Sequence, residues 1–500
     1  MLTESDLEKR QKLASKLFKR LRGESNLWCR KILAQVALQY NARYSTGYYS
    51  SPEIEKVYTD IAETVNTPLS GEYEKGTCLI VTTRTYNMGG HTRVIERWIE
   101  ADTSHKYSLL LTNHNDSCVP PRLVEAIRGN GGDIISVYGE GSVCSRGKKL
   151  REISLKYESV LLFLLEEDVV PLIAYGTTAF TRPVGLYNHI DHLYWTGVSI
   201  ADYVADIRPW GYEVSHNNRG IQNSMIVPVP VETQDRVEYL EKTELRIRLG
   251  LPKEAYIIVT CGREVKYKTS AQGSFLDIVS PILRTMPDVV IVAIGMSFDD
   301  FPDWKDVASR YVDRFHLIKR VPHAELKKYY HAADIVLDSF PAGGITALED
   351  AVHCGCPILS CSKSIDWVFA SPSYCNNKDE LVLRVHDLHE NHVAAYELWE
   401  KTKVIMEKMA GINIFTRQVN IFMENLVKLN HMVRDFVASP THFIQNDFMR
   451  EDQILNATRK PEFLAQMGVK RPTWLWAFII IILQNVLKDV KCLARYFKRT

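Results

Sequence analysis

The sequence is short of the features that mark secreted, membrane-spanning and nucleic-acid-binding proteins. Its ten cysteines are scattered and form no Cys-x-x-Cys pair, which indicates buried free thiols in a reducing compartment. The N-terminus is charged and lacks the apolar core of a signal peptide, so export is not expected. The formal net charge is only +1, so the charge balance suggests no nucleic-acid partner. No internal repeat or low-complexity tract is visible.

What is present is a globular composition. Hydrophobic residues make up 46% of the chain and charged residues 24%, as in ordinary folded proteins. Because 500 residues exceed one typical hydrophobic core, two or three domains are expected.

The N-terminal end has its own character. Segment 3–22 has the spacing of a helix, with Leu13, Leu17 and Leu21 four residues apart, and it is strongly basic. We assign residues 1–70 to a helical extension. The basic residues of the segment are Lys9, Arg10, Lys12, Lys16, Lys19, Arg20 and Arg22.

The C-terminal end is apolar and then amphipathic. The apolar run 474–487 has 14 residues, fewer than the roughly 20 that span a bilayer. From Val486 onward, apolar residues share one helical face and basic residues lie mostly on the other. We expect residues 441–500 to form a tail whose amphipathic helix lies on an anionic membrane surface. The alternative is a terminal helix that packs on its own domain or on a second subunit.

Between the two ends, apolar runs alternate with segments of helical period, which predicts parallel sheets covered by helices. The proline-containing stretch 223–234 divides two such series. We therefore expect an α/β fold with two Rossmann-like domains that face each other across a cleft. The proposed segments are an N-terminal domain at 71–225, a linker at 226–236, a C-terminal domain at 237–410 and a helix that returns to the first domain at 411–440. The predicted strands are 78–84, 107–113, 133–139, 159–165, 182–189, 202–208, 256–262, 288–295, 314–320, 334–340 and 356–361.

A glycine pair follows the first predicted strand. Gly89 and Gly90 permit a tight turn and a close backbone approach, and a helix is expected to start near His91. His91 could then touch a substrate. An ordinary strand–helix turn with an exposed histidine explains the same residues.

The stretch "NHIDHLYW" at 188–195 crowds His189, Asp191 and His192 together at the end of the fifth predicted strand. The His-x-x-His spacing invites a zinc site, but no third ligand cluster accompanies it, so no metal is expected. A His–Asp pair there could orient an acceptor hydroxyl or a phosphate. The alternative is that some of these side chains are structural polar groups.

Cations follow the first strand of the second series. In "CGREVKYKTS" at 261–270, Arg263 and Lys268 lie five residues apart, with Lys266 between them. Arginine can bind two phosphate oxygens at once and lysine supplies a point charge, so the pair suits a diphosphate leaving group. A solvated basic loop is the alternative.

The stretch "DSFPAGGITALEDAVHCG" at 338–355 combines glycines with acids at a predicted helix start. Gly343 and Gly344 would let backbone N–H groups face a ligand, and Thr346 would cap the helix or donate to phosphate. Asp350 could accept hydrogen bonds from both ribose hydroxyls. Plain capping of the helix by acids would also explain Glu349 and Asp350.

Together these pieces resemble the nucleotide-sugar glycosyltransferases of the GT-B fold over about residues 75–430. "GREVKYK" is similar to the cationic loop of that group, and "PVPVE" to its interdomain crossover. The segment "RVPHAELKKYYHAADIVLDSF" resembles the approach to the donor loop, where the resemblance implies that the backbone near Arg320 and Val321 meets the base.

The donor loop departs from the large retaining families, which carry two glutamates eight residues apart. Asp350 matches the second glutamate, but Ala342 stands at the position of the first, which favours inversion. The loop is more similar to that of the protein O-GlcNAc transferases. In that match, Asp338, Gly344, Thr346 and Asp350 fall on the corresponding aspartate, glycine, threonine and aspartate.

The resemblance implies a hexosyl- or N-acetylhexosaminyl-transferase with a UDP-linked donor and no metal cofactor. We expect it to act at the cytoplasmic face of the membrane on a lipid-linked glycan or surface polysaccharide. A homo-oligomer is left open. The alternatives are a sugar-nucleotide 2-epimerase of the same fold and a non-catalytic donor-binding partner of another transferase. The expected catalytic residues are His189, Arg263 and Lys268; the donor-binding residues are Arg320, Val321, Asp338, Gly343, Gly344, Thr346, Glu349 and Asp350; the acceptor-side residues are Gly89, Gly90, His91 and Asp191.

Overall fold

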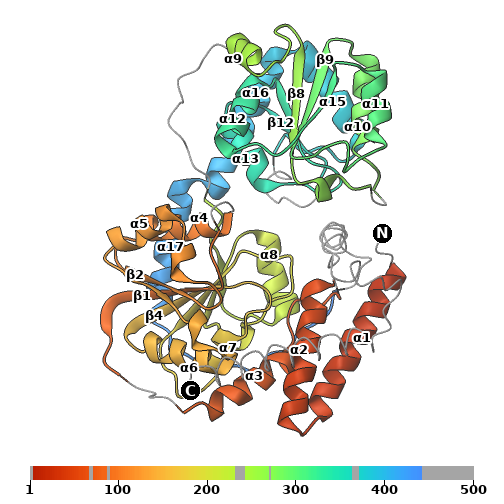
Figure 1. The fold of residues 1–500 in the computed structure, drawn as a ribbon. Coiled ribbons are helices and arrows are strands. Elements are labelled where there is room, and N and C mark those ends of the chain that lie inside the picture. Colours follow the sequence, from red (N-terminus) through yellow and green to blue (C-terminus); the bar gives the residue numbers. More distant parts are fainter. Residues whose placement is uncertain are drawn as a thin grey trace, which may run out of the picture. The chain divides into compact units, whose positions relative to one another are not determined.

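The computed structural model separates the chain into two compact units (Figure 1). One unit spans Pro230–Phe415, and the other spans Leu2–Val229 together with the described residues from Thr416 onward. We refer to them as the C-unit and the N-unit. The structure describes residues 4–44, 46–66, 71–86, 90–230, 242–269, 272–362 and 371–441.

The N-unit is built on a parallel seven-stranded sheet of order β3-β2-β1-β4-β5-β6-β7. The last strand, β7, begins the stretch that the sequence predicts as an extended connector. The strands are β1 (Glu74–Thr82), β2 (Lys106–Leu111), β3 (Ile134–Ser136), β4 (Tyr157–Phe163), β5 (Val184–Asn188), β6 (Tyr203–Asp206) and β7 (Ser224–Ile226).

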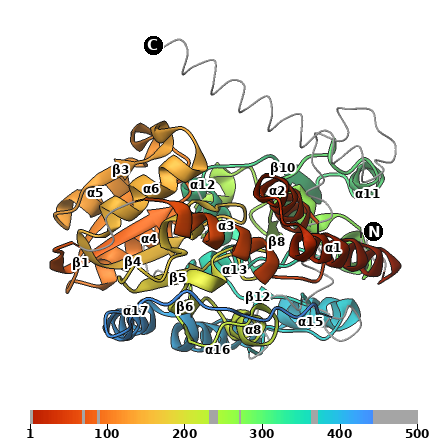
Figure 2. The ribbon, with the colours of Figure 1, turned by 90° about the horizontal axis from the view of Figure 1, so that it is seen from below.

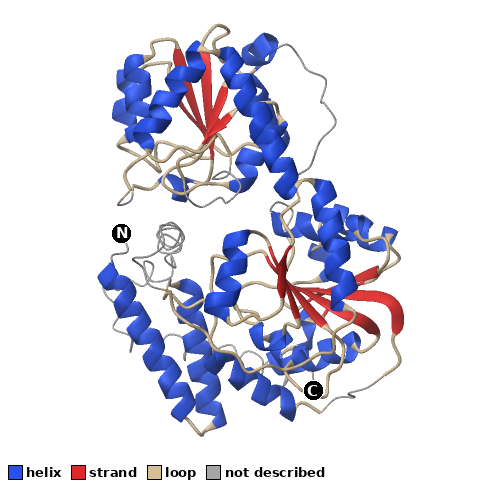
Figure 3. Ribbon diagram, turned by 180° about the vertical axis from the view of Figure 1, so that it is seen from behind, coloured by secondary structure: helices blue, strands red, loops and turns tan. Residues whose placement is uncertain are grey.

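Helices cover both faces of this sheet (Figure 3). Central parallel strands are therefore shielded from water on both sides, and they need continuous rather than alternating apolar sequence. The run Cys78–Val81 of β1 shows this, because all four of its residues are completely buried. The helices that accompany the sheet are α4 (Gly90–Ala101), α5 (Pro121–Gly129), α6 (Val143–Ser154), α7 (Val170–Tyr175) and α8 (Pro209–Val214).

Three helices precede the sheet: α1 (Glu4–Gly23), α2 (Leu27–Arg43) and α3 (Pro52–Thr64). Helices α1 and α2 lie side by side as a hairpin (Figure 2). Helix α3 begins where the Ser51 side chain accepts a hydrogen bond from the Ile54 N–H. From α3, the buried Glu55 carboxylate accepts hydrogen bonds from the successive N–H groups of residues 197–199 at 2.7–3.1 Å. This contact ties the N-terminal helices to the Rossmann-like core.

The end of the described chain also packs on the N-unit. Helix α17 (Ile412–Leu426) places Phe422 against Trp98 and Tyr203, with ring centroids 5.4 and 4.8 Å apart. A Cβ atom at Gly185 of β5 would lie only 2.9 Å from the Leu426 side chain, so glycine permits this close approach.

The segment that follows α17, residues 427–441, is fixed by one buried aspartate. Asp202 accepts hydrogen bonds from His431 Nδ1 at 2.8 Å, from the Met432 N–H at 3.0 Å and from Arg434 at 2.8 Å. Asp202 and His431 are both completely buried. The return of the chain to the N-unit is therefore anchored through buried charge as well as apolar packing.

The C-unit contains a parallel five-stranded sheet of order β10-β9-β8-β11-β12. Successive residues of β8 and β9 enter two separate cores, one on each face, as the two-residue period of a strand requires. The strands are β8 (Tyr256–Cys261), β9 (Val289–Ile294), β10 (Phe315–Ile318), β11 (Ile335–Leu337) and β12 (Ile358–Leu359). The helices are α9 (Lys242–Arg248), α10 (Leu276–Thr285), α11 (Trp304–Arg310), α12 (His323–Ala332), α13 (Ile345–His353), α15 (Lys378–Glu390) and α16 (His392–Ala410).

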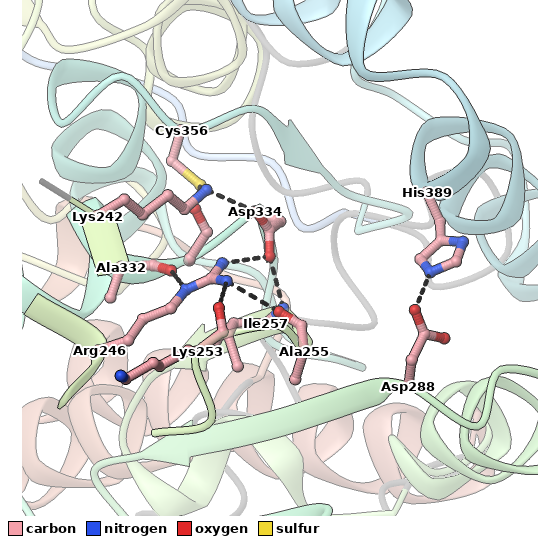
Figure 4. Close-up of polar contacts among 11 residues, drawn as sticks. Lys242, Arg246, Lys253, Ala255, Ile257, Asp288, Ala332, Asp334, Cys356 and His389 are labelled. Atoms are coloured by element: carbon pink, nitrogen blue, oxygen red, sulfur yellow. Dashed lines mark hydrogen bonds and ion pairs between the residues drawn. The ribbon is translucent and has the colours of Figure 1, made fainter. Parts of the chain in front are cut away.

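A buried arginine fastens the first helix of the C-unit to its sheet (Figure 4). Arg246 of α9 donates to the carbonyls of residues 253, 255 and 332 and pairs with Asp334 at 2.6 Å. The same carboxylate accepts from the Ile257 N–H of β8 at 2.7 Å. A guanidinium suits this position because its several donors satisfy carbonyls and a carboxylate together.

The two parallel sheets, each with helices on both faces, confirm the predicted α/β class with Rossmann-like domains and a helical N-terminal extension. Within the described ranges, no helix combines the length and the apolar character needed to cross a membrane. The predicted amphipathic tail at 441–500 lies almost wholly outside the described residues.

Candidate functional site

The loop between β11 and α13 is organised from inside by Asp338. Its carboxylate accepts hydrogen bonds from the Ser339 and Gly344 N–H groups at 2.8 and 2.9 Å and from Ser360 Oγ at 2.7 Å. Burial raises the pKa of Asp338 to about 6, against the opposing effects of Ser360 and the Lys266 charge. Because the carboxylate is directed at its own loop, Asp338 shapes the loop between β11 and α13 rather than presenting a charge at its surface.

Side chains of neighbouring residues lie close to both glycines of this loop, and the surroundings of Gly343 are the tighter. A Cβ atom at Gly343 would lie 2.5 Å from Asp338 Oδ2, and one at Gly344 would lie 2.6 Å from Lys266 Nζ. Their N–H groups are already used, since Gly343 donates to Ser362 Oγ at 3.0 Å and Gly344 to Asp338. The N–H groups of Gly343 and Gly344 themselves are therefore used within the loop.

The groups that remain for a ligand come from the first turn of α13. Gly344 is the N-cap residue, and the N–H groups of the following turn have no partner inside the helix. Thr346 lies in that turn and is exposed. A helix start of this kind attracts anions through its N–H groups and dipole.

Lys266 connects the cationic loop at 261–270 to the glycine-containing loop between β11 and α13. Its ammonium donates to the Gly343 carbonyl at 2.9 Å, and its own carbonyl accepts from the Ala342 N–H at 3.2 Å. Sequence reasoning placed Lys266 only nearby, because nothing local distinguishes it from Arg263 and Lys268.

Arg263 and Lys268 flank the short 3-10 helix at Glu264–Tyr267 and are both exposed. Within the described part of the chain, neither side chain makes a hydrogen bond or an ion pair. Lys266, in contrast, donates a hydrogen bond to the Gly343 carbonyl. The charges of Arg263 and Lys268 are therefore available to an anionic ligand.

Asp350 of α13 is paired with a residue that the sequence analysis missed. His323 Nε2 lies 2.7 Å from Asp350 Oδ2, and both side chains are partly exposed. His323 begins α12, directly after the loop that contains Arg320, which is exposed, and Val321, which is half-buried. A carboxylate held in this way is accessible and has a fixed orientation, as a contact to two hydroxyl groups would require.

Glu349 points into the C-unit instead of outward. Only 7% of this residue is exposed, and burial, reinforced by the neighbouring Asp350 charge, raises the pKa of Glu349 to about 8. The carboxyl group is therefore mostly protonated at neutral pH. A buried, neutral Glu349 does not fit the predicted role of an ionised donor contact.

In the N-unit, two histidines stack beyond the carboxyl ends of the strands. His91 of α4 and His189 after β5 have ring centroids 4.2 Å apart at an interplanar angle of 45°. His91 Nε2 donates to the Phe163 carbonyl at 3.3 Å, which leaves Nδ1 as the unprotonated nitrogen. Of the other predicted residues there, Gly90 is the first residue of α4, and Gly89 lies outside the described residues.

The adjacent imidazole rings of His91 and His189 are neutral. Burial lowers the pKa of His91 to about 4, and burial together with repulsion from His91 lowers the pKa of His189 well below its usual value. Both nitrogens of His189 and Nδ1 of His91 are covered and have no hydrogen-bond partner among the described residues. Because one nitrogen of a neutral imidazole is unprotonated, one nitrogen of His189 and Nδ1 of His91 are able to accept a proton or a hydrogen bond from a bound hydroxyl.

Asp191 does not face an acceptor, contrary to expectation. It is completely buried and makes two contacts with Arg208, Nε to Oδ2 at 2.6 Å and Nη2 to Oδ1 at 3.1 Å. Burial raises its pKa, but the charge of Arg208 and the hydrogen bond from His192 outweigh this effect and hold the pKa far below the usual range. Asp191 is therefore the carboxylate of a structural ion pair with Arg208, and His192 Nδ1 lies 3.3 Å from Asp191 Oδ1.

A second buried arginine supports the same loop from the other side. Arg219 donates to the carbonyls of Asp191 and Leu193 at 2.6 and 2.8 Å. Its guanidinium lies over the rings of Tyr49 and Trp195, 4.9 Å from each centroid. Arg208 and Arg219 together fix the backbone that presents His189.

The described residues were compared with the ligand sets that bind metal ions. Among the described residues, no group of three or more His, Cys, Asp and Glu side chains could hold a metal ion. The pair His189 and His192 thus lacks further ligands within that part of the chain.

Comparison with known proteins places the fold. No protein-family model and no curated protein sequence matches the chain. Among solved structures, Anabaena Alr3699/HepE in complex with UDP and glucose matches with a TM-score of 0.50 and 11% identity over 70% of this chain and 100% of that one. A mutant of Thermobaculum terrenum O-GlcNAc transferase matches with a TM-score of 0.52 and 12% identity over 84% of this chain and 82% of that one. The chain has the GT-B fold of these glycosyltransferases.

Proposed function

We propose that the protein transfers a sugar from a nucleoside diphosphate sugar, UDP-linked, to the hydroxyl group of a glycan acceptor. The observation that carries the proposal is the C-unit loop system. Two exposed and unpaired cations, Arg263 and Lys268, flank a short helix whose Lys266 is bonded to the glycine loop that starts α13. Fixed positive charge near a helix N-terminus favours a diphosphate that gains charge as its bond to the sugar breaks.

The similar structures support a nucleotide-sugar substrate. HepE is described in complexes with UDP and with UDP-glucose, and the Thermobaculum protein is an O-GlcNAc transferase. In our proposal, the ribose hydroxyls donate to Asp350, the diphosphate meets Arg263, Lys268 and Thr346, and the base contacts the backbone near Arg320 and Val321.

The N-unit would contribute a base. In the proposed reaction, the acceptor oxygen attacks the anomeric carbon and its proton passes to a neutral imidazole. The bond from that carbon to the diphosphate breaks, and the nucleoside diphosphate leaves. His189 is our choice for the base because both its nitrogens lack partners among the described residues and its pKa is lowered. His91 would share this role through Nδ1.

The acceptor and the location are proposed from the ends of the sequence. The apolar run 474–487 and the basic residues that follow it suit an interfacial segment on anionic lipid. We therefore propose a lipid-linked glycan or a surface polysaccharide as acceptor, at the cytoplasmic face of the membrane. A protein without residues 471–500 should lose its binding to anionic vesicles and keep its donor affinity.

A panel of sugar nucleotides tests the proposed function. Each donor is incubated with the full-length protein, with and without a lipid-linked acceptor, and the products are separated. Release of nucleoside diphosphate together with glycosylated acceptor supports a transferase. Conversion of the donor to its 2-epimer would identify an isomerase, and binding without turnover a non-catalytic partner.

A further inference from the structure

Three basic side chains at the carboxyl edge of the N-unit sheet have no role in the chemistry proposed so far. Arg84 follows β1, His114 follows β2, and Arg146 lies near the start of α6, and all three are partly exposed. Ligands of open α/β sheets bind outside the carboxyl ends of the strands, where the strand order reverses. In this sheet the order reverses between β1 and β4, so Arg84 follows a strand at that point.

Hydrogen bonds bring the segments that carry these side chains together. Arg146 Nη1 donates to Asn113 Oδ1 at 3.3 Å and to the preceding carbonyl at 3.1 Å, which places its guanidinium at the end of β2, beside the chain at His114. The Asn113 N–H donates to the carbonyl of Thr83, the residue before Arg84, at 3.0 Å. The three basic residues therefore lie on adjoining segments of one sheet edge.

Acidic side chains do not neutralise this group. Among the described residues, Arg84 and His114 make no side-chain hydrogen bond or ion pair, and Arg146 donates only to uncharged oxygens. Asp168 interacts with the Arg146 charge, but it is buried and its carboxylate already accepts from two threonine hydroxyls and a backbone N–H. The exposed Asp116 accepts from the N–H of the next residue and pairs with none of the three within the described ranges.

The arginines of this edge differ from those with a structural role in the same unit. Arg208 meets the buried Asp191 carboxylate with two contacts, and Arg30 pairs with Asp60. A half-buried guanidinium without a carboxylate partner costs stability, and one bound oxyanion can compensate two such groups at once. The edge at Arg84 and Arg146 is thus suited to an anion that comes from solution.

We infer that Arg84, His114 and Arg146 bind an oxyanion carried by the glycan acceptor, either a phosphate or a carboxylate. The inference rests on the proposed function and names the charge of the acceptor. Guanidinium groups bind two oxygens of either anion, and the imidazole can donate a further hydrogen bond. Strands β1 and β2 lie two and three strand spacings, or about 10 and 14 Å, from β5, which precedes His189. The anion would therefore select the acceptor at a distance from the attacking hydroxyl.

Binding of alkyl probes to the full-length protein tests this charge preference. Every protein in the comparison carries Arg263→Ala and Lys268→Ala, so that the exposed cations of the C-unit do not bind the probes. Decyl glucoside is the neutral probe, decyl glucuronide carries a carboxylate, and decyl diphosphate carries phosphate. Calorimetry should show that at least one anionic probe binds at least about tenfold more tightly than decyl glucoside, with a smaller difference in high salt.

The two anionic probes distinguish the sources of the charge. Tighter binding of decyl diphosphate would indicate the phosphates of a lipid carrier, and tighter binding of decyl glucuronide an acidic glycan. Either result supports the inference. Equal affinities for all three probes overturn it.

Substitutions locate the preference on this edge. Arg84→Gln and Arg146→Gln should each reduce it at least about tenfold, and Arg146→Lys should retain part of it. Arg84 has no partner among the described residues, so its replacement should leave the fold intact. The control Arg128→Gln removes an exposed arginine of the same unit and should keep the preference. The inference is wrong if Arg84→Gln keeps the preference or if Arg128→Gln loses it equally.

A resonance of His114 reports binding at the site itself. In protein labelled with ¹³C at histidine, this signal is identified by its absence from His114→Gln. It should shift on addition of the preferred anionic probe and stay in place with decyl glucoside. An anionic probe that binds without moving the His114 signal binds elsewhere, which contradicts the inference.

The outcome is separable from that of the proposed function. UDP affinity is measured on proteins that retain Arg263 and Lys268, and Arg84→Gln should leave it unchanged because the proposed donor contacts all lie in the C-unit. If the wild type binds no sugar nucleotide, the proposed function fails. The probe comparison still decides whether the edge at Arg84 and Arg146 binds an anion.

Discussion

His323, the first residue of α12, and Asp350 of α13 form a hydrogen bond between two neighbouring helices of the C-unit, with 2.7 Å between Nε2 and Oδ2. The pair orients a carboxylate beside the glycine loop while leaving part of it exposed. Its members lie 27 residues apart in the chain, in elements that the strand between them brings together.

Removal of this carboxylate should weaken nucleotide binding more than it slows the chemical step. Ribose contacts are made equally in the ground state and the transition state, so Asp350→Ala should raise the Kd for UDP at least about tenfold. His323→Gln should give a smaller rise, because the carboxylate remains but loses its orientation. Calorimetric titration with UDP measures both. Unchanged UDP affinity with reduced turnover would contradict the ribose role.

Loss of either exposed cation should slow turnover. Arg263→Ala and Lys268→Ala each remove a charge-assisted contact to the leaving diphosphate, so kcat should fall at least about tenfold. Lys253→Ala, an exposed lysine of the same unit, serves as the control and should leave kcat unchanged. If both test variants fold and keep the wild-type rate, the assignment of the donor site is wrong.

The pH profile should reveal the neutral histidines. Because burial lowers the pKa of His189 well below 6.5 and that of His91 to about 4, the base stays unprotonated in mildly acidic solution. Activity should therefore not fall near pH 6.5, as it would with an unperturbed imidazole, but only at lower pH. His189→Ala should lower kcat about a hundredfold or more, whereas exposed His392→Ala should not. A break at pH 6.5 in kcat would count against His189.

Glu349 should make the stability of the C-unit depend on pH. Its pKa rises from 4.5 to about 8 on folding, so the folded state binds the proton more tightly than the unfolded state. The associated stability is complete below pH 4.5 and is lost as the pH rises through 8. Between those limits the loss is on the order of 3 kcal/mol. Denaturant unfolding at pH 5 and pH 8.5 should show this loss in the wild type and a flatter profile in Glu349→Gln. Parallel profiles would mean that Glu349 is ionised in the folded protein.

Activity should persist in a chelator. We expect Arg263, Lys268 and the start of α13 to neutralise the diphosphate without a metal ion. The measurement is the rate of donor turnover before and after treatment with EDTA, with added Mg²⁺, Mn²⁺ or Zn²⁺ as controls. Loss of activity that a divalent ion restores would contradict this prediction and make His189 and His192 candidate metal ligands.

Most of the fold could be predicted because its strands are parallel and buried on both faces. Continuous apolar runs such as 159–165 and 288–295 mark such strands; β4 overlaps the first run, and β9 lies within the second. Strand β7 was missed because it is a three-residue edge strand followed by prolines, which read as a connector.

The candidate site was less predictable, because its details depend on contacts between distant residues. Sequence motifs proposed loops at strand ends as the site, but Asp191 meets Arg208 only in the folded N-unit, and Asp350 meets His323 only when α12 and α13 pack. Glu349 is buried and Asp350 is partly exposed, and this difference depends on which face of α13 meets the core. No local pattern of charge distinguishes these adjacent acids.

The return of the chain after Thr416 makes the N-unit discontinuous in sequence. A gene fragment that ends at Val229 would leave Trp98, Gly185 and Tyr203 without the helix that covers them, and it would leave Asp202 buried without His431 and Arg434. Among the described residues, the C-unit is in contrast one segment that ends at Phe415. A chimera could therefore exchange the C-unit by replacing one stretch of chain, whereas exchange of the N-unit requires both flanking stretches to be replaced together.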